Sequence, residues 1–135
     1  MTPARRIRIT GAVAAAVCLA IGLATQLLAW SPAVDALASV LYVALVGALV
    51  MVVAPALPGL AVAAIAFGFA TAIELLQLTG IPRAIVDVFP AAHLLLGNAF
   101  DPFDLVAYAV GAVVVFVLRR LAAGRRVAAS AQSVA

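Results

Sequence analysis

The sequence predicts an all-α membrane protein in which four transmembrane helices form a bundle. Of the 135 residues, 68% are hydrophobic and 10% are charged, whereas soluble domains carry about 25% charged residues. Four apolar runs each have close to the roughly 20 residues that cross about 30 Å of hydrocarbon as a helix. Because the runs follow one another with no polar block between them, we expect a single integral membrane domain over residues 1–135.

Proline and glycine set the breaks between the runs. Ser31-Pro32 ends the first run, the prolines of segment 55–59 force a turn after the second, and Gly80-Ile81-Pro82 ends the third. Proline has this effect because it cannot continue a helix and restricts the residue before it. The predicted membrane spans are therefore about 9–30, 34–54, 60–79 and 103–121.

The distribution of basic residues predicts the topology. All eight are arginines, and seven lie near the two ends of the chain. An even number of crossings places both termini on one side, and positive flanks are retained in the cytoplasm. We therefore predict a multi-pass protein of the inner (plasma) membrane with cytoplasmic N- and C-termini. The first run continues to Trp30, so we predict an uncleaved helix rather than a secretory signal. Residues 124–135 are predicted to form a disordered basic tail.

The net charge of +3 reflects this topology rather than nucleic-acid binding. Membrane lipids are the expected partners, since arginine-rich ends suit anionic headgroups, and a homo-oligomer is compatible with the sequence. Cys18 is the single cysteine and lies in an apolar run, so no intramolecular disulfide can form.

The connection between the third and fourth runs, residues 80–101, is long for a helical bundle. Within it, Pro90 begins an apolar stretch that ends before Gly97, a pattern typical of a helix with proline at its first position and glycine just past its end. This helix is too short to span a bilayer. We expect it to lie in the interface or to re-enter the bundle.

Polar residues on the last two runs predict a site. Glu74 and Gln77 share a helix face, and Asp104 and Tyr108 form a matching stripe on the fourth run. A charged side chain at membrane depth costs about 2.5–3.5 kcal/mol or more, so the stripes should face each other and enclose a pocket below the connection. With Arg83 as the nearest countercharge, the candidate ligand-binding residues are Glu74, Gln77, Arg83, Asp104 and Tyr108.

Several of these residues have structural interpretations too. Asp101 and Pro102 have the pattern of a helix cap followed by proline at the first helical position. Glu74 is either half of a buried pair with Arg83 or a site for a ligand, an ion or a proton. His93 is an interfacial side chain, a ligand or a proton carrier.

Catalytic and metal-binding motifs do not stand out in the sequence. The spacing of the acids and the histidine resembles no metal motif, so we predict no metal and no cofactor. We also find no phosphate-binding glycine loop, nucleophile elbow or Cys/His pair, and we assign no catalytic residue.

Small residues recur at four-residue spacing on the last two runs. Ala64, Gly68 and Ala72 form one stripe, and Ala107 and Gly111 form another. Such stripes allow helix backbones to approach closely, but an alanine-rich chain also produces the same spacing by chance.

Two segments carry a resemblance to a known family. Glu74-Leu-Leu-Gln77 and the stretch from Leu96 to Gly111, which reads LGNAFDPFDLVAYAVG, resemble the DUF2809 family of small bacterial membrane proteins of unknown function. The segment from Asp35 to Tyr42 is similar to that family's second helix. The family pattern usually has an arginine before the Leu-Gly step, where this chain has His93. A looser similarity exists to the VanZ-like membrane proteins. The resemblance implies a four-helix membrane protein and supplies no activity.

Three functions are compatible with these observations. The first is an accessory module whose outer pocket binds a lipid headgroup or an envelope precursor. The second is a proton- or cation-coupled transporter that uses Glu74 as the carrier, because intramembrane carboxylates mark proton relays. The third is an enzyme that acts on a lipid-linked substrate with Glu74 and Asp104 as an acid–base pair. The sequence favours them in this order.

Overall fold

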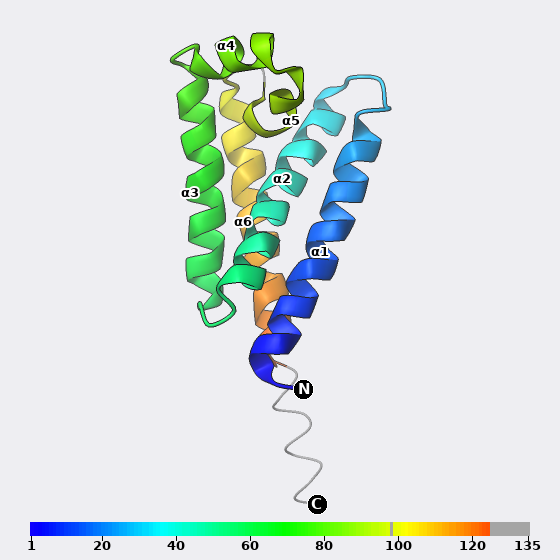
Figure 1. The fold of residues 1–135 in the computed structure, drawn as a ribbon, viewed down its shortest axis with the longest axis vertical. Coiled ribbons are helices and arrows are strands. Elements are labelled where there is room, and N and C mark those ends of the chain that lie inside the picture. Colours follow the sequence, from blue (N-terminus) through cyan, green and yellow to red (C-terminus); the bar gives the residue numbers. More distant parts are fainter. Residues whose placement is uncertain (98, 125–135) are drawn as a thin grey trace, which may run out of the picture.

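Four long helices run along an elongated bundle, and short helices cover the end opposite the termini (Figure 1). The computed structural model describes residues 1–97 and 99–124, and every regular element in this part of the chain is helical, which confirms the predicted all-α fold. From residue 125 onward, the predicted disordered tail lies outside the described residues. The four long helices are α1 (Pro3–Thr25), α2 (Pro32–Val53), α3 (Gly59–Gln77) and α6 (Pro102–Gly124).

The first helix differs most from its predicted limits. It begins at Pro3 rather than at residue 9, because Thr2 caps it by accepting a hydrogen bond from the backbone N–H of Arg5, and Pro3 fits the first helical position. It ends at Thr25 rather than at Trp30. The basic N-terminal segment is therefore part of α1.

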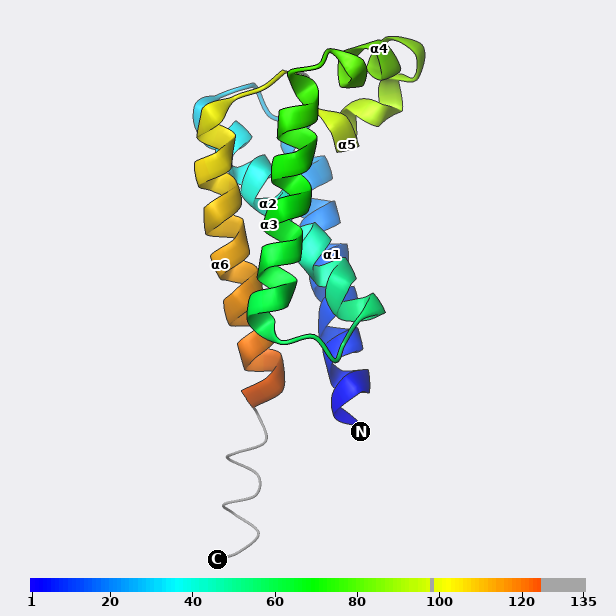
Figure 2. The same ribbon diagram turned by 90° about the vertical axis from the view of Figure 1, so that its left-hand side faces the viewer.

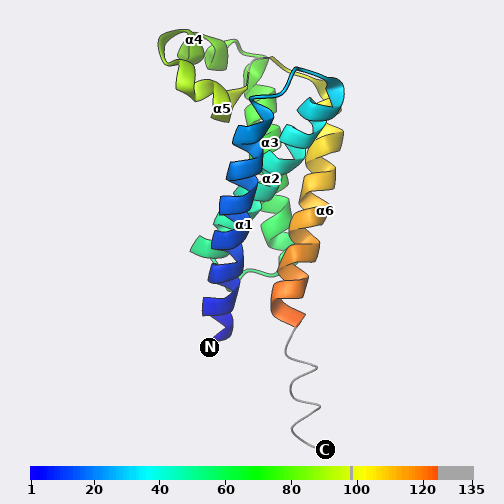
Figure 3. The same ribbon diagram turned by 90° about the vertical axis from the view of Figure 1, so that its right-hand side faces the viewer.

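The connection from residue 80 to 101 contains more helix than predicted. The 3-10 turn Pro90–Ala92 and α5 (His93–Leu96) form the predicted short helix, and Gly97 follows with a positive φ of 64°. An additional helix, α4 (Ile81–Val88), precedes them. Gly80, with φ of 74°, turns the chain from α3 into α4. All three views place α4 and α5 at the end away from the N-terminus (Figure 1, Figure 2 and Figure 3).

The second helix occupies the centre of the bundle, where it packs against α1, α3 and α6. Its Val43 and Met51 are fully buried, as are Val62 of α3 and Val115 of α6. Close approach of α6 to α2 depends on Gly111, since a Cβ there would lie 2.8 Å from Cβ of Val43. The Ala107/Gly111 stripe is thus a packing surface.

The outer faces of the four long helices are apolar. Exposed residues on them include Val13, Leu49, Leu60 and Val113, and all four helices are long and apolar enough to cross a membrane. A soluble protein would not expose so much apolar surface, because doing so is unfavourable in water. The chain is a multi-pass membrane protein.

Candidate functional site

A polar cavity of about 430 Å³ lies between the long helices at the end covered by α5. Four carboxylates line it: Asp35 from α2, Glu74 from α3, Asp101 just before α6, and Asp104 from the first turn of α6. We call this the acid cavity. Its volume falls in the range of about 300–1,000 Å³ that is typical of small-molecule sites.

Glu74 joins α3 to the start of α6. Its side chain is 0% exposed, and both carboxylate oxygens accept hydrogen bonds. Oε1 accepts from the backbone N–H of Asp101 at 2.6 Å, and Oε2 accepts from the hydroxyl of Tyr108 at 3.0 Å. The polar stripes of the third and fourth spans therefore face each other as predicted. A buried carboxylate with these two donors is a strong clamp between the helices, since hydrogen bonds to charged groups are stronger than neutral ones.

The two aspartates at the start of α6 have different partners. Asp101 Oδ1 accepts a hydrogen bond from the backbone N–H of Phe103 at 2.9 Å, and Pro102 is the first residue of the helix. This is the geometry of a helix cap. Asp104, which is partly buried, instead accepts a 2.7 Å hydrogen bond from the hydroxyl of Ser39 on α2. The second carboxylate oxygen of Asp104 is available to accept a hydrogen bond from a ligand in the cavity.

The carbonyl end of α5 is tied to the bundle by two side chains. Gln77 Nε2 donates to the carbonyl oxygen of Leu96 at 2.7 Å, and the hydroxyl of Tyr42 donates to that of Leu95 at 3.1 Å. Gly97 lets the chain pass close to Gln77, because a Cβ at this position would lie 2.6 Å from Nε2. Among the residues that the structure describes, the buried Oε1 atom of Gln77 has no hydrogen-bond partner, so it is an available acceptor beside the cavity.

The charge of the acid cavity is one-sided. The described residues that line it include four carboxylates and His93 but no arginine or lysine. Arg83, predicted as the countercharge, is exposed on α4 and does not line the cavity. It lies elsewhere because residues 81–88 form a helix of their own rather than a loop folded over the site. Within residues 1–97 and 99–124, no group of three histidine, cysteine or acidic side chains could hold a metal ion.

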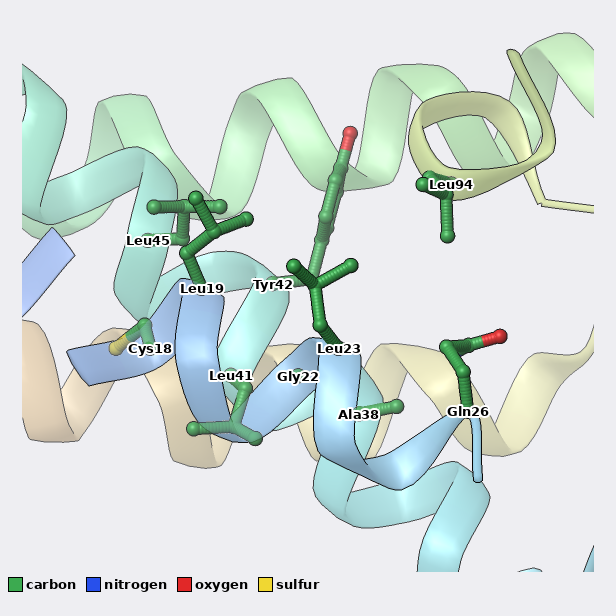
Figure 4. Close-up of a pocket in the computed structure, with 10 residues that line it drawn as sticks. All are labelled: Cys18, Leu19, Gly22, Leu23, Gln26, Ala38, Leu41, Tyr42, Leu45 and Leu94. Carbon is green, nitrogen blue, oxygen red and sulfur yellow. The ribbon is translucent and has the colours of Figure 1, made fainter. Parts of the chain in front are cut away.

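An apolar groove of about 130 Å³ adjoins the acid cavity. It runs between α1 and α2 and ends against Leu94 of α5 (Figure 4). Cys18, Leu19 and Leu45 lie toward one end of it, and Gln26 and Leu94 lie toward the other (Figure 4). We call it the side groove. The two spaces share four lining residues: Gln26, Ala38, Tyr42 and Leu94.

Sequence reasoning missed the contribution of α2 to this site. Asp35, Ser39 and Tyr42 all line the acid cavity, but none of the three is among the residues that the sequence predicts for the site. Their spacing of four and three residues places them on one helix face. A third polar stripe was therefore present in the sequence, although only one of its members is charged.

The comparisons with known proteins place the site within a family. A family model described as a protein of unknown function (DUF2809) matches residues 28–112, which is more than half of the chain. The matched segment includes all four carboxylates of the acid cavity, as well as Gln77 and Tyr108. No curated protein matches the chain, and no solved structure does.

Proposed function

We propose that this chain, which belongs to the DUF2809 family of proteins of unknown function, is a membrane-embedded binding protein for a lipid whose headgroup carries a primary ammonium. The observation that carries the proposal is the set of four carboxylates around a cavity to which the described part of the chain contributes no arginine or lysine. A primary ammonium supplies both the missing positive charge and three hydrogen-bond donors. Carboxylates placed together in a low-dielectric environment favour such a cation strongly.

The hydrogen-bond partners of the individual acids indicate a different role for each. Glu74 has both oxygens bonded within the protein and holds the site together. Asp104 uses one oxygen for Ser39, and Asp35 is a partly buried residue in the first turn of α2. We therefore assign direct contact with the ammonium to Asp35 and Asp104. The free oxygen of Gln77 is a further acceptor for an ammonium or hydroxyl proton.

A lipid is favoured over a water-soluble amine because the side groove lies next to the acid cavity and shares lining residues with it. A headgroup bound at Asp35 and Asp104 would reach the groove past Tyr42 and Leu94, which line both spaces. The groove is bordered mainly by apolar side chains such as Leu19, Leu23 and Leu45. An acyl chain suits this surface, since burial of each methylene contributes about 0.8 kcal/mol.

The arginines at the opposite end of the bundle indicate which side of the membrane the acid cavity faces. By the preference of positive residues for the cytoplasmic side, the acid cavity faces outward and takes its lipid from the outer leaflet of the plasma membrane. Both a bulk phospholipid and a lipid-linked envelope precursor with a free amine have the required chemistry. The bundle would retain or present such a lipid as an accessory to other membrane components.

Proton-coupled transport is the alternative raised by the sequence, with Glu74 as the carrier. The hydrogen bonds from Asp101 and Tyr108 favour a structural role for Glu74 over a carrier role. The two functions differ in their readout. Binding predicts ligand retention without flux in proteoliposomes, whereas transport predicts proton movement that Glu74→Gln abolishes.

Lipid titration followed by native mass spectrometry tests the binding proposal. We expect phosphatidylethanolamine to bind the wild type more tightly than phosphatidylcholine, whose quaternary ammonium has no N–H donor, and the double variant Asp35→Asn/Asp104→Asn to weaken phosphatidylethanolamine binding about tenfold or more. Asp87→Asn is the matched control, because Asp87 is an exposed acid on α4 that does not line the cavity. Equal affinity for the two lipids, or equal loss in the control, contradicts the proposal. A lipid-linked amine from a cell extract that displaces phosphatidylethanolamine would identify the precursor as the ligand.

A further inference from the structure

A second cavity, of about 450 Å³, lies at the opposite end of the bundle, where residues near the N-terminus line it. It is bordered by the first turns of α1, by the turn between α2 and α3 at Pro55 and Ala56, and by the last turns of α6. Of the residues up to 124 that the structure describes, the arginines Arg6 and Arg119 line it and no acidic residue does. We call it the basic cavity.

Arg119 is an unusual residue in this position. Its side chain is 8% exposed, although arginine is almost never buried without a partner. Nη2 donates to the carbonyl oxygen of Pro55 at 3.0 Å, while Nε is buried and has no hydrogen-bond partner among residues 1–97 and 99–124. One neutral carbonyl does not balance a buried guanidinium, which offers five donors and a full positive charge.

The neighbouring arginine, Arg120, lies in a different environment from Arg119. Arg120 is exposed, and its guanidinium carbon lies 5.0 Å from the ring centroid of Phe116, a favourable cation–π arrangement at the surface. It therefore needs no further partner. The buried position of Arg119, in a cavity that it shares with a second cation, requires a different explanation.

The start of α1 adds to the positive potential. Thr2, Pro3 and Ala4 line the basic cavity, and the N-terminal end of a helix carries a partial positive charge and unsatisfied N–H groups. Thr2 already bonds to the N–H of Arg5. The helix end and the two arginines all favour an anion in the space between α1 and α6.

We propose that the basic cavity binds the phosphate group of an anionic membrane lipid. The guanidinium groups of Arg6 and Arg119 hold the phosphate oxygens, and a phosphate fits their planar arrays of donors. Because α1 and α6 leave the cavity as membrane-spanning helices, the acyl chains of the bound lipid extend along their apolar outer faces. The bound phosphate neutralises Arg119 and joins the first helix to the last.

This site is independent of the acid cavity. Both arginines lie outside the family match at residues 28–112. The ligand charge is also opposite, since the basic cavity takes an anion and the acid cavity takes a cation. Loss of one site leaves the other unchanged.

Titration of the purified full chain with phosphatidylglycerol, against a phosphatidylcholine background, tests the proposal. Arg6→Gln should weaken phosphatidylglycerol binding about five- to tenfold, because it removes charge-assisted hydrogen bonds to the phosphate. Arg8→Gln is the matched control. It removes the same charge from α1 at an exposed position that does not line the cavity, and it should change the affinity less than about twofold.

A second variant separates ligand binding from folding. Arg119→Lys keeps the positive charge but loses the planar guanidinium, so the protein should still fold and bind phosphatidylglycerol more weakly than the wild type. Equal effects of Arg6→Gln and Arg8→Gln would mean that the arginines attract anionic lipid only as a diffuse charge, and would overturn the proposal. Inorganic phosphate is the second probe. If it binds in an Arg6-dependent way while phosphatidylglycerol does not, the lipid source is wrong.

Discussion

Replacement of Tyr108 by phenylalanine removes one hydroxyl from the centre of the bundle and leaves the ring in place. This hydroxyl donates the 3.0 Å hydrogen bond to Oε2 of Glu74, and Tyr108 is itself buried. Because phenylalanine fills nearly the same volume, the variant creates no large cavity. Any change in stability therefore reports the hydrogen bond between α3 and α6.

The expected loss follows from what such bonds contribute elsewhere. Hydrogen bonds to charged groups contribute about 1.5–3 kcal/mol in soluble proteins, whereas interhelical hydrogen bonds in membranes average about 0.6 and reach about 1.7 kcal/mol. Glu74 keeps its second bond, from the backbone of Asp101. We therefore expect Tyr108→Phe to lower the free energy of unfolding by about 1–2 kcal/mol.

Unfolding in mixed detergent micelles by added sodium dodecyl sulfate, followed through the fluorescence of Trp30, measures this loss. Tyr42→Phe is the control, because its hydroxyl donates to the neutral carbonyl of Leu95 at an exposed site. The control should lose about 0.5 kcal/mol. In a Glu74→Met background the effect of Tyr108→Phe should shrink by about 1 kcal/mol. Equal losses in both backgrounds would refute the clamp between Glu74 and Tyr108.

Four further substitutions test the packing of the long helices, the close approach at Gly97 and the role of Ser39. Gly111→Ala should destabilise the bundle in the same unfolding assay, because its Cβ would lie 2.9 Å from the carbonyl oxygen of Val40. Gly68→Ala is the contrasting variant, since its Cβ meets nothing within 4 Å. It should leave the stability unchanged or raise it by about 0.5–1 kcal/mol. Gly97→Ala should increase amide hydrogen exchange in residues 90–101, because Gly97 has φ of 64° and the added Cβ would lie 2.6 Å from Gln77. Unchanged exchange would contradict the close approach. Ser39→Ala should weaken phosphatidylethanolamine binding in the lipid titration by about two- to fivefold, since Asp104 loses the 2.7 Å hydrogen bond that fixes its carboxylate; unaltered affinity would argue against a role for Asp104.

The fold was predictable because hydropathy and proline positions are strong local signals. The limits of α2 and α3 differ from the prediction by two residues or fewer. The missed helix, α4, shows where such signals fail. Ile81, Ile85 and Val88 have the spacing of one apolar helix face, but the flanking Gly80 and Pro82 were interpreted only as helix breakers. Proline is also tolerated in the first turn of a helix, where Pro82 lies.

The site was predictable in part, because polar side chains must avoid lipid. This constraint predicted that the stripe of Glu74 on the third span faces the stripe of Tyr108 on the fourth. It gave no information about Arg83, which lies at the exposed end of the bundle, where water or headgroups can solvate a charge. Ser39 and Tyr42 were overlooked because a neutral hydroxyl in an apolar run carries little energetic signal by itself.

The two stripes of small residues show that spacing in the sequence does not by itself identify a packing surface. Gly111 lies against α2, whereas Gly68 faces outward with open space around its Cα. Both have identical spacing in sequence, and only the rotation of each helix decides which stripe is buried. Hydropathy does not set this rotation when both faces of the helix are apolar.

The proposed binding of an ammonium lipid in the acid cavity is tested most directly by the lipids that purify with the protein. Mild extraction from phosphatidylethanolamine-rich membranes, followed by mass spectrometry, should recover an amine-bearing lipid from the wild type and from Asp87→Asn. The same lipid should be depleted in Asp35→Asn/Asp104→Asn. An identical lipid profile in all three proteins, or enrichment of an anionic lipid that depends on Asp35 and Asp104, would contradict the proposed function.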